Sequence, residues 1–206
     1  MANAIQLAEQ VTLQSNHLLK KPHQLKLIGK GRSAFVFKIE SEAKVIKVFF
    51  PEFEHLADQE AKIYKQLGNS TYFPTIYETG PNFIIMDYIE GHTFYECLIN
   101  GIPITKDMIE RVDEALDHAR SRGLNPSDIH LQNLILTTDG EVKVIDVVRF
   151  TQQKQCFQWD DLKDAHQKFY YGKRLSNRKI PKYVIQLVAL FYKKLYAPFR
   201  VKRGSL

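Results

Sequence analysis

Short apolar segments of alternating pattern, separated by glycine or small polar residues, follow one another after residue 24. They are rich in β-branched and aromatic residues, which is typical of strands. The segments are residues 25–31, 33–40 and 44–50. Glycines at the first break and small polar residues at the second favour tight turns. The pattern therefore predicts three antiparallel strands.

The next segment changes to helical spacing. Residues 54–67 place Leu56, Ile63 and Leu67 among strong helix formers, as expected for one helix packed against a sheet. Two further short apolar runs, residues 73–80 and 82–90, predict two more strands. The first half of the chain is therefore expected to be mostly β-structure with one packed helix.

After Gly91 the pattern is mainly helical. Residues 106–123 form the clearest helical segment, and Gly123 is a suitable stop. Residues 133–146 then predict a hairpin, because Asp139 and Gly140 lie between two apolar runs. The last fifty residues return to helical spacing, and residues 4–20 predict a short helix or an irregular arm.

These elements predict an α+β fold with a boundary near residues 89–92. We expect an N-terminal arm or helix at 1–24, a β-rich lobe at 25–90 and a mostly helical lobe at 91–206. A chain of 206 residues, 44% of them hydrophobic, is long enough for one core or for two small lobes that share a cleft.

Composition also narrows the cellular setting. The apolar runs are too short or too interrupted to predict a membrane-spanning helix, and the first ten residues do not resemble a secretory signal. The two cysteines, Cys97 and Cys156, are too few for a disulfide framework. We therefore expect a cytoplasmic protein.

Positive charge is concentrated at the C-terminal end. Residues 151–206 hold 13 Lys or Arg against 3 Asp, whereas residues 1–150 hold 16 against 20 acidic residues. Such a field attracts nucleic acid, anionic lipid or an acidic protein. Residues 173–206 are therefore a candidate surface for nucleic acid or an acidic partner, and a packed final helix with a solvated basic face is the alternative.

Three oxygen-bearing side chains gather around the predicted hairpin. Asp128 precedes Asn133 by five residues, and Asp146 follows thirteen residues later at the end of an apolar run. Carboxylate and amide oxygens suit a hard cation such as Mg²⁺. Taken alone, this fragment favours a turn that Asp128 and Asn133 cap.

The first predicted turn and the third predicted strand add two features of phosphate chemistry. Gly29 and Gly31 would let backbone N–H groups approach phosphate oxygens, although a tight hairpin explains them as well. Lys47 lies between apolar neighbours and needs an anionic partner if it is buried. Glu60 on the following helix could be that partner, and the alternative is a lysine that reaches out to water.

Taken together, the residues resemble the protein-kinase-like superfamily, whose signature comprises a glycine-rich loop, a strand lysine, a helix glutamate, a catalytic aspartate, an asparagine and a metal-binding aspartate. All six occur here in that order. They are Gly29 and Gly31, Lys47, Glu60, Asp128, Asn133 and Asp146. The run IIMDY, residues 84–88, lies where the hinge between the lobes is expected.

This resemblance implies ATP and Mg²⁺ as cofactors. Asp128 would orient or deprotonate the attacking hydroxyl, Lys47 and Glu60 would form the supporting ion pair, and Asn133 and Asp146 would hold the metal. The implied ATP-binding residues are Gly29, Gly31, Val36, Val45, Lys47, Met86, Asp87, Ile89 and Ile135, with Tyr88 completing the hinge.

The chain departs from the family pattern at several places. Pro126-Ser127 replaces His-Arg, Val147-Val148 replaces Phe-Gly, and His130 stands where many protein kinases have a lysine that contacts the transferring phosphate. The short interval after Asp146 is similar to the small atypical kinases, including the Rio group, the KEOPS-complex kinase and short predicted bacterial serine/threonine kinases. In these groups an Asp-Leu pair, here Asp161 and Leu162, supports the catalytic loop. A helix-starting carboxylate is the alternative for Asp161.

The resemblance implies a serine/threonine protein kinase that phosphorylates itself or a protein partner. The alternatives are a pseudokinase or an ATPase switch in a protein or RNA assembly, and a small-molecule kinase. Fold analogy alone does not choose among them.

Overall fold

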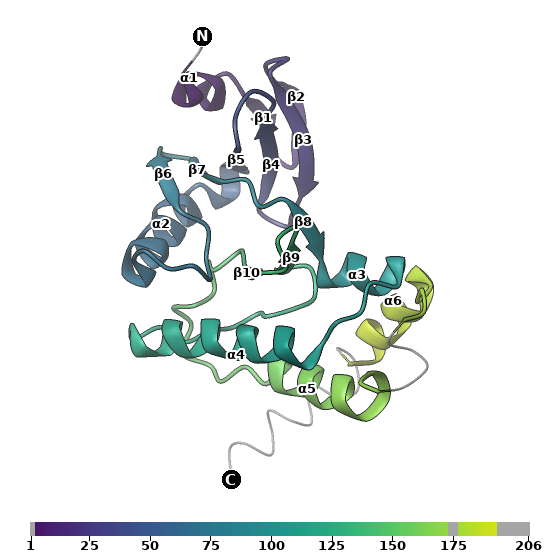
Figure 1. The fold of residues 1–206 in the computed structure, drawn as a ribbon. Helices are drawn as coiled ribbons and strands as arrows, with labels where there is room; N and C mark the ends of the chain where they lie inside the picture. The colour runs from purple at the N-terminus through teal and green to yellow at the C-terminus, as the bar shows by residue number, and fades with distance from the viewer. Residues whose placement is uncertain (1–2, 173–176, 193–206) are drawn as a thin grey trace.

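A five-stranded antiparallel sheet forms the N-terminal part of the computed structural model, which describes residues 3–172 and 177–192 (Figure 1). The strand order is β3-β4-β5-β7-β6. The bounds are β3 Leu25–Lys30, β4 Ala34–Ile39, β5 Lys44–Phe49, β6 Ile76–Thr79 and β7 Phe83–Asp87. All five strands occur in the segments that the apolar pattern predicted.

One face of this sheet is covered by the N-terminal helix α1 (Ala4–Glu9). Because strand side chains alternate between faces, β4 and β5 send every second residue to this side. Phe35, Phe37 and Ile46 pack there with Leu7 of α1 in one apolar cluster. The predicted short helix is thus confirmed, and it shields sheet surface that would otherwise be exposed.

The opposite face of the sheet packs on the rest of the molecule. Val45, Phe49 and Ile84 belong to a cluster that also contains Ile63 and Leu67 of helix α2 (His55–Leu67). This cluster continues into the helices of the C-terminal part. The residues between the sheet and these helices therefore lie at a continuous apolar junction.

The C-terminal part is mostly helical, with one small sheet of order β10-β9-β8 (Figure 1). Its strands are β8 Gly91–Thr93, β9 Leu134–Thr137 and β10 Val142–Val144, and its helices are α3 Phe94–Asn100, α4 Lys106–Ser121, α5 Gln158–Ala165, the short π-helix η2 His166–Tyr170 and α6 Lys182–Phe191. The predicted hairpin is confirmed, because Val142 pairs with Leu136 across the turn at Gly140. The predicted stop of α4 is also confirmed, with Gly123 in the left-handed region at φ 76°.

Two features went beyond the sequence-based prediction. Residues 4–20 include a small hairpin, β1 (Thr12–Gln14) with β2 (His17–Lys20), which a short apolar pattern did not indicate. A 3₁₀ turn, η1 (Pro51–Phe53), precedes α2. None of the helices among the described residues is long and apolar enough to span a membrane.

The predicted basic surface at 173–206 lies partly outside the described residues, which omit 173–176 and 193–206. Within it, α6 forms as the helical spacing predicted. Its apolar side chains Tyr183, Leu187, Val188 and Leu190 are exposed. The described part of α6 therefore does not bury its whole apolar surface.

The role of α1 in covering the sheet gives a test of stability. Leu7 is 3% exposed, whereas Leu19 in β2 is 60% exposed. We expect Leu7→Ala to lower the free energy of unfolding by about 2–4 kcal/mol because it leaves a cavity in a packed cluster. Leu19→Ala, the matched control, should change it by less than about 0.5 kcal/mol. Urea denaturation measures both, and equal effects would contradict this role for α1.

Candidate active site

Lys47 is held between two carboxylates that come from distant parts of the chain. Its Nζ lies 2.6 Å from Glu60 Oε2 on α2 and 3.0 Å from Asp146 Oδ1, which follows β10. The structure thus brings together three residues that the sequence singled out. The predicted Lys47–Glu60 partnership is present, and the alternative of a lysine reaching out to water is wrong.

The Lys47–Glu60 pair is buried, with side-chain exposures of 11% and 0%. Burial alone would lower the pKa of Lys47, but the charges of Glu60 and Asp146 outweigh it and raise that pKa above its usual value. Burial also raises the pKa of Glu60, although Lys47 opposes this. Glu60 Oε1 has no hydrogen-bond partner among the described residues. The pair therefore depends on its own mutual attraction.

Asp146 is prepared to act as an anion. Burial would raise its pKa, but Lys47, followed by His130 and Arg32, holds that pKa below its usual value. Its Oδ1 contacts Lys47, which leaves Oδ2 for another ligand. An ionised carboxylate with one uncommitted oxygen is suitable for a hard cation.

Asn133 offers a second oxygen of the same kind. Its amide nitrogen donates to the Asp128 carbonyl oxygen at 3.1 Å, so its amide oxygen can bind a metal. The Asn133 carbonyl accepts from the Ile145 N–H at 2.9 Å, which ties it to the residue before Asp146. No three His, Cys, Asp or Glu side chains among the described residues form a metal-binding group. Asn133 and Asp146 therefore fit Mg²⁺ only if phosphate and water complete its shell.

Backbone hydrogen bonds fix the loop that carries Asp128. The Asn125 N–H donates to the Phe150 carbonyl at 2.7 Å, and the Asn125 side chain donates to the Gln152 carbonyl at 2.7 Å. Asp128 and Asp146 adopt left-handed backbone angles, with φ of 61° and 59°. Aspartate tolerates this conformation better than most residues. The loop and the segment after Asp146 thus form one connected unit.

Two arginines contact the Asp128 carboxylate, and sequence reasoning missed both. Arg32 Nη2 lies 2.7 Å from Asp128 Oδ2, and Arg149 Nε lies 3.2 Å from the same oxygen. Arg32 is in the predicted glycine-rich loop, and Arg149 follows Asp146 by three residues. Only proximity to other predicted site residues could have marked them, because neither belongs to the family signature.

Four of the predicted nucleotide-binding residues lie on the sheet face that meets the C-terminal part, namely Val36, Val45, Lys47 and Met86, whereas Asp87 pairs with Lys44 and lies on the other face. Gly29 pairs with Val36, Val36 with Lys47, and Val45 with Met86, so these residues occupy adjacent strands of one face. The Gly31 N–H donates to the Ala34 carbonyl at 2.9 Å, as the hairpin interpretation of this turn predicted. Ile135 lies in β9, which pairs with β8 and β10.

The backbone N–H groups at the predicted hinge differ in whether they have a hydrogen-bond acceptor within the protein. The N–H groups of Asp87 and Tyr88 donate to the carbonyls of Thr75 and Ala43. The Asp87 carboxylate accepts from Tyr77 Oη at 2.6 Å. In the parts of the chain that the structure describes, the Ile89 N–H has no hydrogen-bond acceptor. It is therefore available to a ligand.

Asp161 lies in the first turn of α5 and accepts a hydrogen bond from Tyr192 Oη at 2.8 Å. This bond links α5 to the residue after α6. The proposed support of the catalytic loop by Asp161 stays a prediction. In the same helix, the Trp159 indole N–H donates to Asp113 at 2.7 Å and joins α5 to α4.

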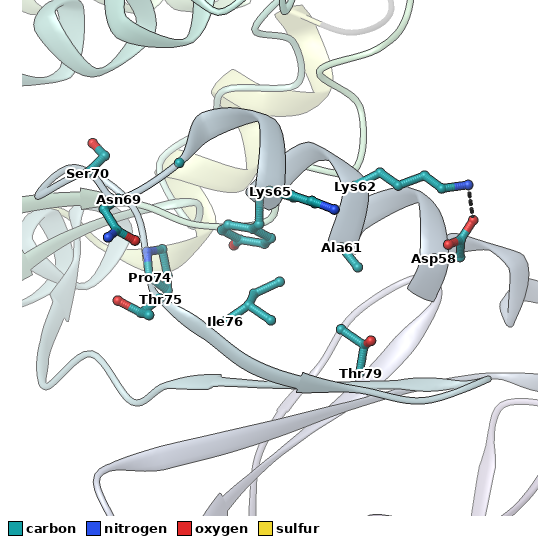
Figure 2. A pocket seen from close by; sticks show the side chains of 12 residues that line it. Asp58, Ala61, Lys62, Lys65, Asn69, Ser70, Pro74, Thr75, Ile76 and Thr79 are labelled. Carbon is teal, nitrogen blue, oxygen red and sulfur yellow. Dashed lines mark ion pairs between the residues drawn. The ribbon is translucent and has the colours of Figure 1, made fainter.

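A pocket on a different face of α2 contains none of the predicted site residues. It is lined by Asp58, Ala61, Lys62 and Lys65 of α2 and by Ile76 and Thr79 of β6, among others (Figure 2). Lys62 pairs there with Asp58 at 2.6 Å. We do not assign the nucleotide to this pocket, because Lys47 and the signature carboxylates do not line it.

The buried ion pair predicts a large effect on stability when one partner is removed. Lys47→Met leaves Glu60 buried without its cation and should lower the free energy of unfolding by about 3–5 kcal/mol. Replacing both residues, Lys47→Met with Glu60→Leu, should recover most of this loss. Urea denaturation measures each value.

The matched control is the exposed Lys62–Asp58 pair on α2, the helix that also carries Glu60. Its side-chain exposures are 73% and 71%. Lys62→Met should change stability by less than about 0.5 kcal/mol, because water already screens that pair. A Lys47→Met variant no less stable than Lys62→Met would contradict the interpretation of the buried pair.

Comparisons with known proteins identify similar chains. A Bacillus subtilis protein named "Putative serine/threonine-protein kinase YrzF" is 54% identical over 177 residues, which cover 85% of this chain and 82% of that protein. A "Probable serine/threonine-protein kinase" of Streptomyces coelicolor is 30% identical over 108 residues, and one of Clostridium perfringens is 26% identical over 140 residues.

The extent of these matches differs. They cover 47% of this chain and 16% of the Streptomyces protein, and 59% of this chain and 20% of the Clostridium protein. No protein-family model matches the chain. The Bacillus protein matches over most of both chains at high identity, and the Streptomyces and Clostridium proteins share its kinase name. The chain therefore belongs to the serine/threonine protein kinases, as a small kinase-like member of that family.

Proposed function

We propose that this protein is an ATP- and Mg²⁺-dependent phosphotransferase that phosphorylates serine or threonine hydroxyls of a protein, itself included. The observation that carries the proposal is the bridge from Lys47 to both Glu60 and Asp146. Kinase chemistry needs this lysine and this metal aspartate in place together. The assembled ion cluster supports an active arrangement of these groups.

The residues around the bridge would divide the work of phosphoryl transfer. Lys47 would contact the nucleotide phosphates, and Asn133 and Asp146 would hold Mg²⁺ through their uncommitted oxygens. When bound, the metal neutralises charge on the phosphates. Because the protein mainly positions reactants in this chemistry, the rigid links between Asn133, Ile145 and Asp128 support the assignment.

Asp128 would orient the acceptor hydroxyl and take its proton. Both arginines contact its Oδ2, and the described residues donate no hydrogen bond to Oδ1. Oδ1 is therefore the oxygen that we assign to the acceptor. A general base must lie within hydrogen-bond reach of the proton it removes, so an uncommitted oxygen favours this role.

The proposed architecture has two lobes, residues 25–90 and 91–206, with an arm or helix at 1–24. ATP would lie between them, with its adenine against Val36, Val45, Met86 and Ile135. The backbone of Asp87 and Ile89 would bind the adenine edge. The free Ile89 N–H supports this hinge assignment.

A nucleotide-dependent switch is the second candidate. The contact of Arg32 and Arg149 with Asp128 favours it, because both cations occupy one oxygen of the proposed base. In that case the protein would hydrolyse ATP slowly, or bind it without turnover, and transmit its state to a partner.

Labelled ATP distinguishes these functions. We expect purified protein with Mg²⁺ and γ-labelled ATP to acquire label on serine or threonine. Asp146→Asn and Asp128→Asn should each reduce the rate by at least about 100-fold, since each removes a charged group from the reacting centre. Phosphoamino-acid analysis and release of free phosphate are followed separately.

Asp139→Asn is the matched control, because this exposed aspartate lies in the turn between β9 and β10. It should retain the wild-type rate. Label that persists in Asp146→Asn would contradict the proposed site, and free phosphate without protein label would favour the switch. ATP binding without turnover would instead favour a pseudokinase.

A further inference from the structure

We propose that Arg32 is a further catalytic residue, whose guanidinium leaves Asp128 and neutralises the transferring phosphoryl group. This inference rests on the proposed kinase function and deepens it. Arg32 lies in the turn between β3 and β4, beside Gly31, and reaches across to the loop of Asp128. It therefore joins the two sides of the proposed nucleotide site.

The geometry places the Arg32 charge where the reaction occurs. Its Nη2 is 2.7 Å from Asp128 Oδ2, next to the oxygen assigned to the acceptor hydroxyl. A cation that contacts the proposed base also lies close to any phosphate that passes to the acceptor hydroxyl.

Arg32 is free to change partners, whereas Arg149 is suited to remain on Asp128. The Arg32 side chain is 73% exposed and that of Arg149 is 49% exposed. Arg149 follows Val148, whose carbonyl accepts a 3.0 Å hydrogen bond from Gln59 of α2. This contact anchors the Arg149 segment, so Arg149 can keep the carboxylate oriented when Arg32 moves to phosphate.

The catalytic loop also has a histidine at a position where a permanent cation would serve the reaction. His130 stands in place of the catalytic-loop lysine that contacts the transferring phosphate in many protein kinases. A guanidinium binds phosphate through paired N–H donors and stays charged at any physiological pH. Arg32 can therefore supply the positive charge that this loop does not provide as a lysine.

In the proposed step, the acceptor hydroxyl gives its proton to Asp128 Oδ1 as its oxygen bonds to the γ-phosphorus. The bond between that phosphorus and the β,γ-bridging oxygen breaks, and its electron pair leaves with ADP. Arg32 is unchanged covalently. Its role is to bind the oxygens of the phosphoryl group more tightly in transit than in ATP, which is the condition for catalysis.

The test uses a mimic of the transferring group and needs no acceptor substrate. Calorimetry of the full chain measures affinity for MgADP alone and for MgADP with aluminium fluoride. Wild-type protein should bind the fluoride complex more tightly. Arg32→Ala should lose at least about 10-fold of that gain, because one preorganised donor to a transition state has an effect of this order or larger. Its MgADP affinity should change little.

One further variant and a chemical rescue separate this role from a general charge effect. Lys26→Ala removes an exposed cation from β3, the strand that leads into the Arg32 turn, and should keep the full gain. Added guanidinium ion should restore part of the gain to Arg32→Ala, because it replaces the missing cation. If the substitution only distorted the structure, added guanidinium ion would not restore the gain. Turnover of labelled ATP should fall in Arg32→Ala, stay unchanged in Lys26→Ala and recover in part with guanidinium ion. In Arg32→Ala, kcat should change by a larger factor than KM.

Other results would overturn the proposal. An undiminished gain in Arg32→Ala, or equal weakening of MgADP with and without fluoride, would show that Arg32 does not act on the transferring group. The same conclusion follows if wild-type protein binds MgADP but shows no gain. Failure of wild-type protein to bind MgADP would instead refute the proposed function, and the role of Arg32 with it.

Discussion

The buried ammonium of Lys47 is the constraint on which the site depends. It lies on β5 and is satisfied by Glu60 from α2 and by Asp146 from the segment after β10. A charge removed from water needs such partners, because the desolvation of one buried ion in a protein costs on the order of several kcal/mol. The three contributing segments must therefore meet at one point, and the sheet, the packed helix and the C-terminal part are positioned together.

Charge balance explains the arrangement around Asp128. Arg32 and Arg149 both contact this carboxylate. A nucleotide would bring several negative charges into the same space, and a mobile guanidinium could then exchange one anion for another. This exchange needs a flexible partner and a fixed one, which the exposure of Arg32 and the anchored segment of Arg149 provide.

Features that depend on residues close together in the sequence were predicted better than contacts between distant residues. The strands and α2 follow local periodicity, and the Asp139-Gly140 turn follows from the conformational freedom of glycine. The hairpin β1–β2 escaped detection because its two strands have only three and four residues. The proposed roles of Asp128, Asn133 and Asp146 follow from their order along the chain, whereas the contacts of Arg32 and Arg149 could not be predicted from it.

By itself, the sequence determined the chemical types available and their order, because residue identity and spacing along a strand or helix are local properties. It thereby indicated Lys47 and Glu60 as partners and the kinase family as their context, whereas the contact of Lys47 with Asp146 appeared only in the structure. Only the tertiary structure decided that Arg32, 96 residues from Asp128, would meet it. Such a contact depends on how β3, β4 and the loop after α4 pack together. The spacing of apolar residues within one element cannot predict this contact, since it depends on the packing of many residues from several elements.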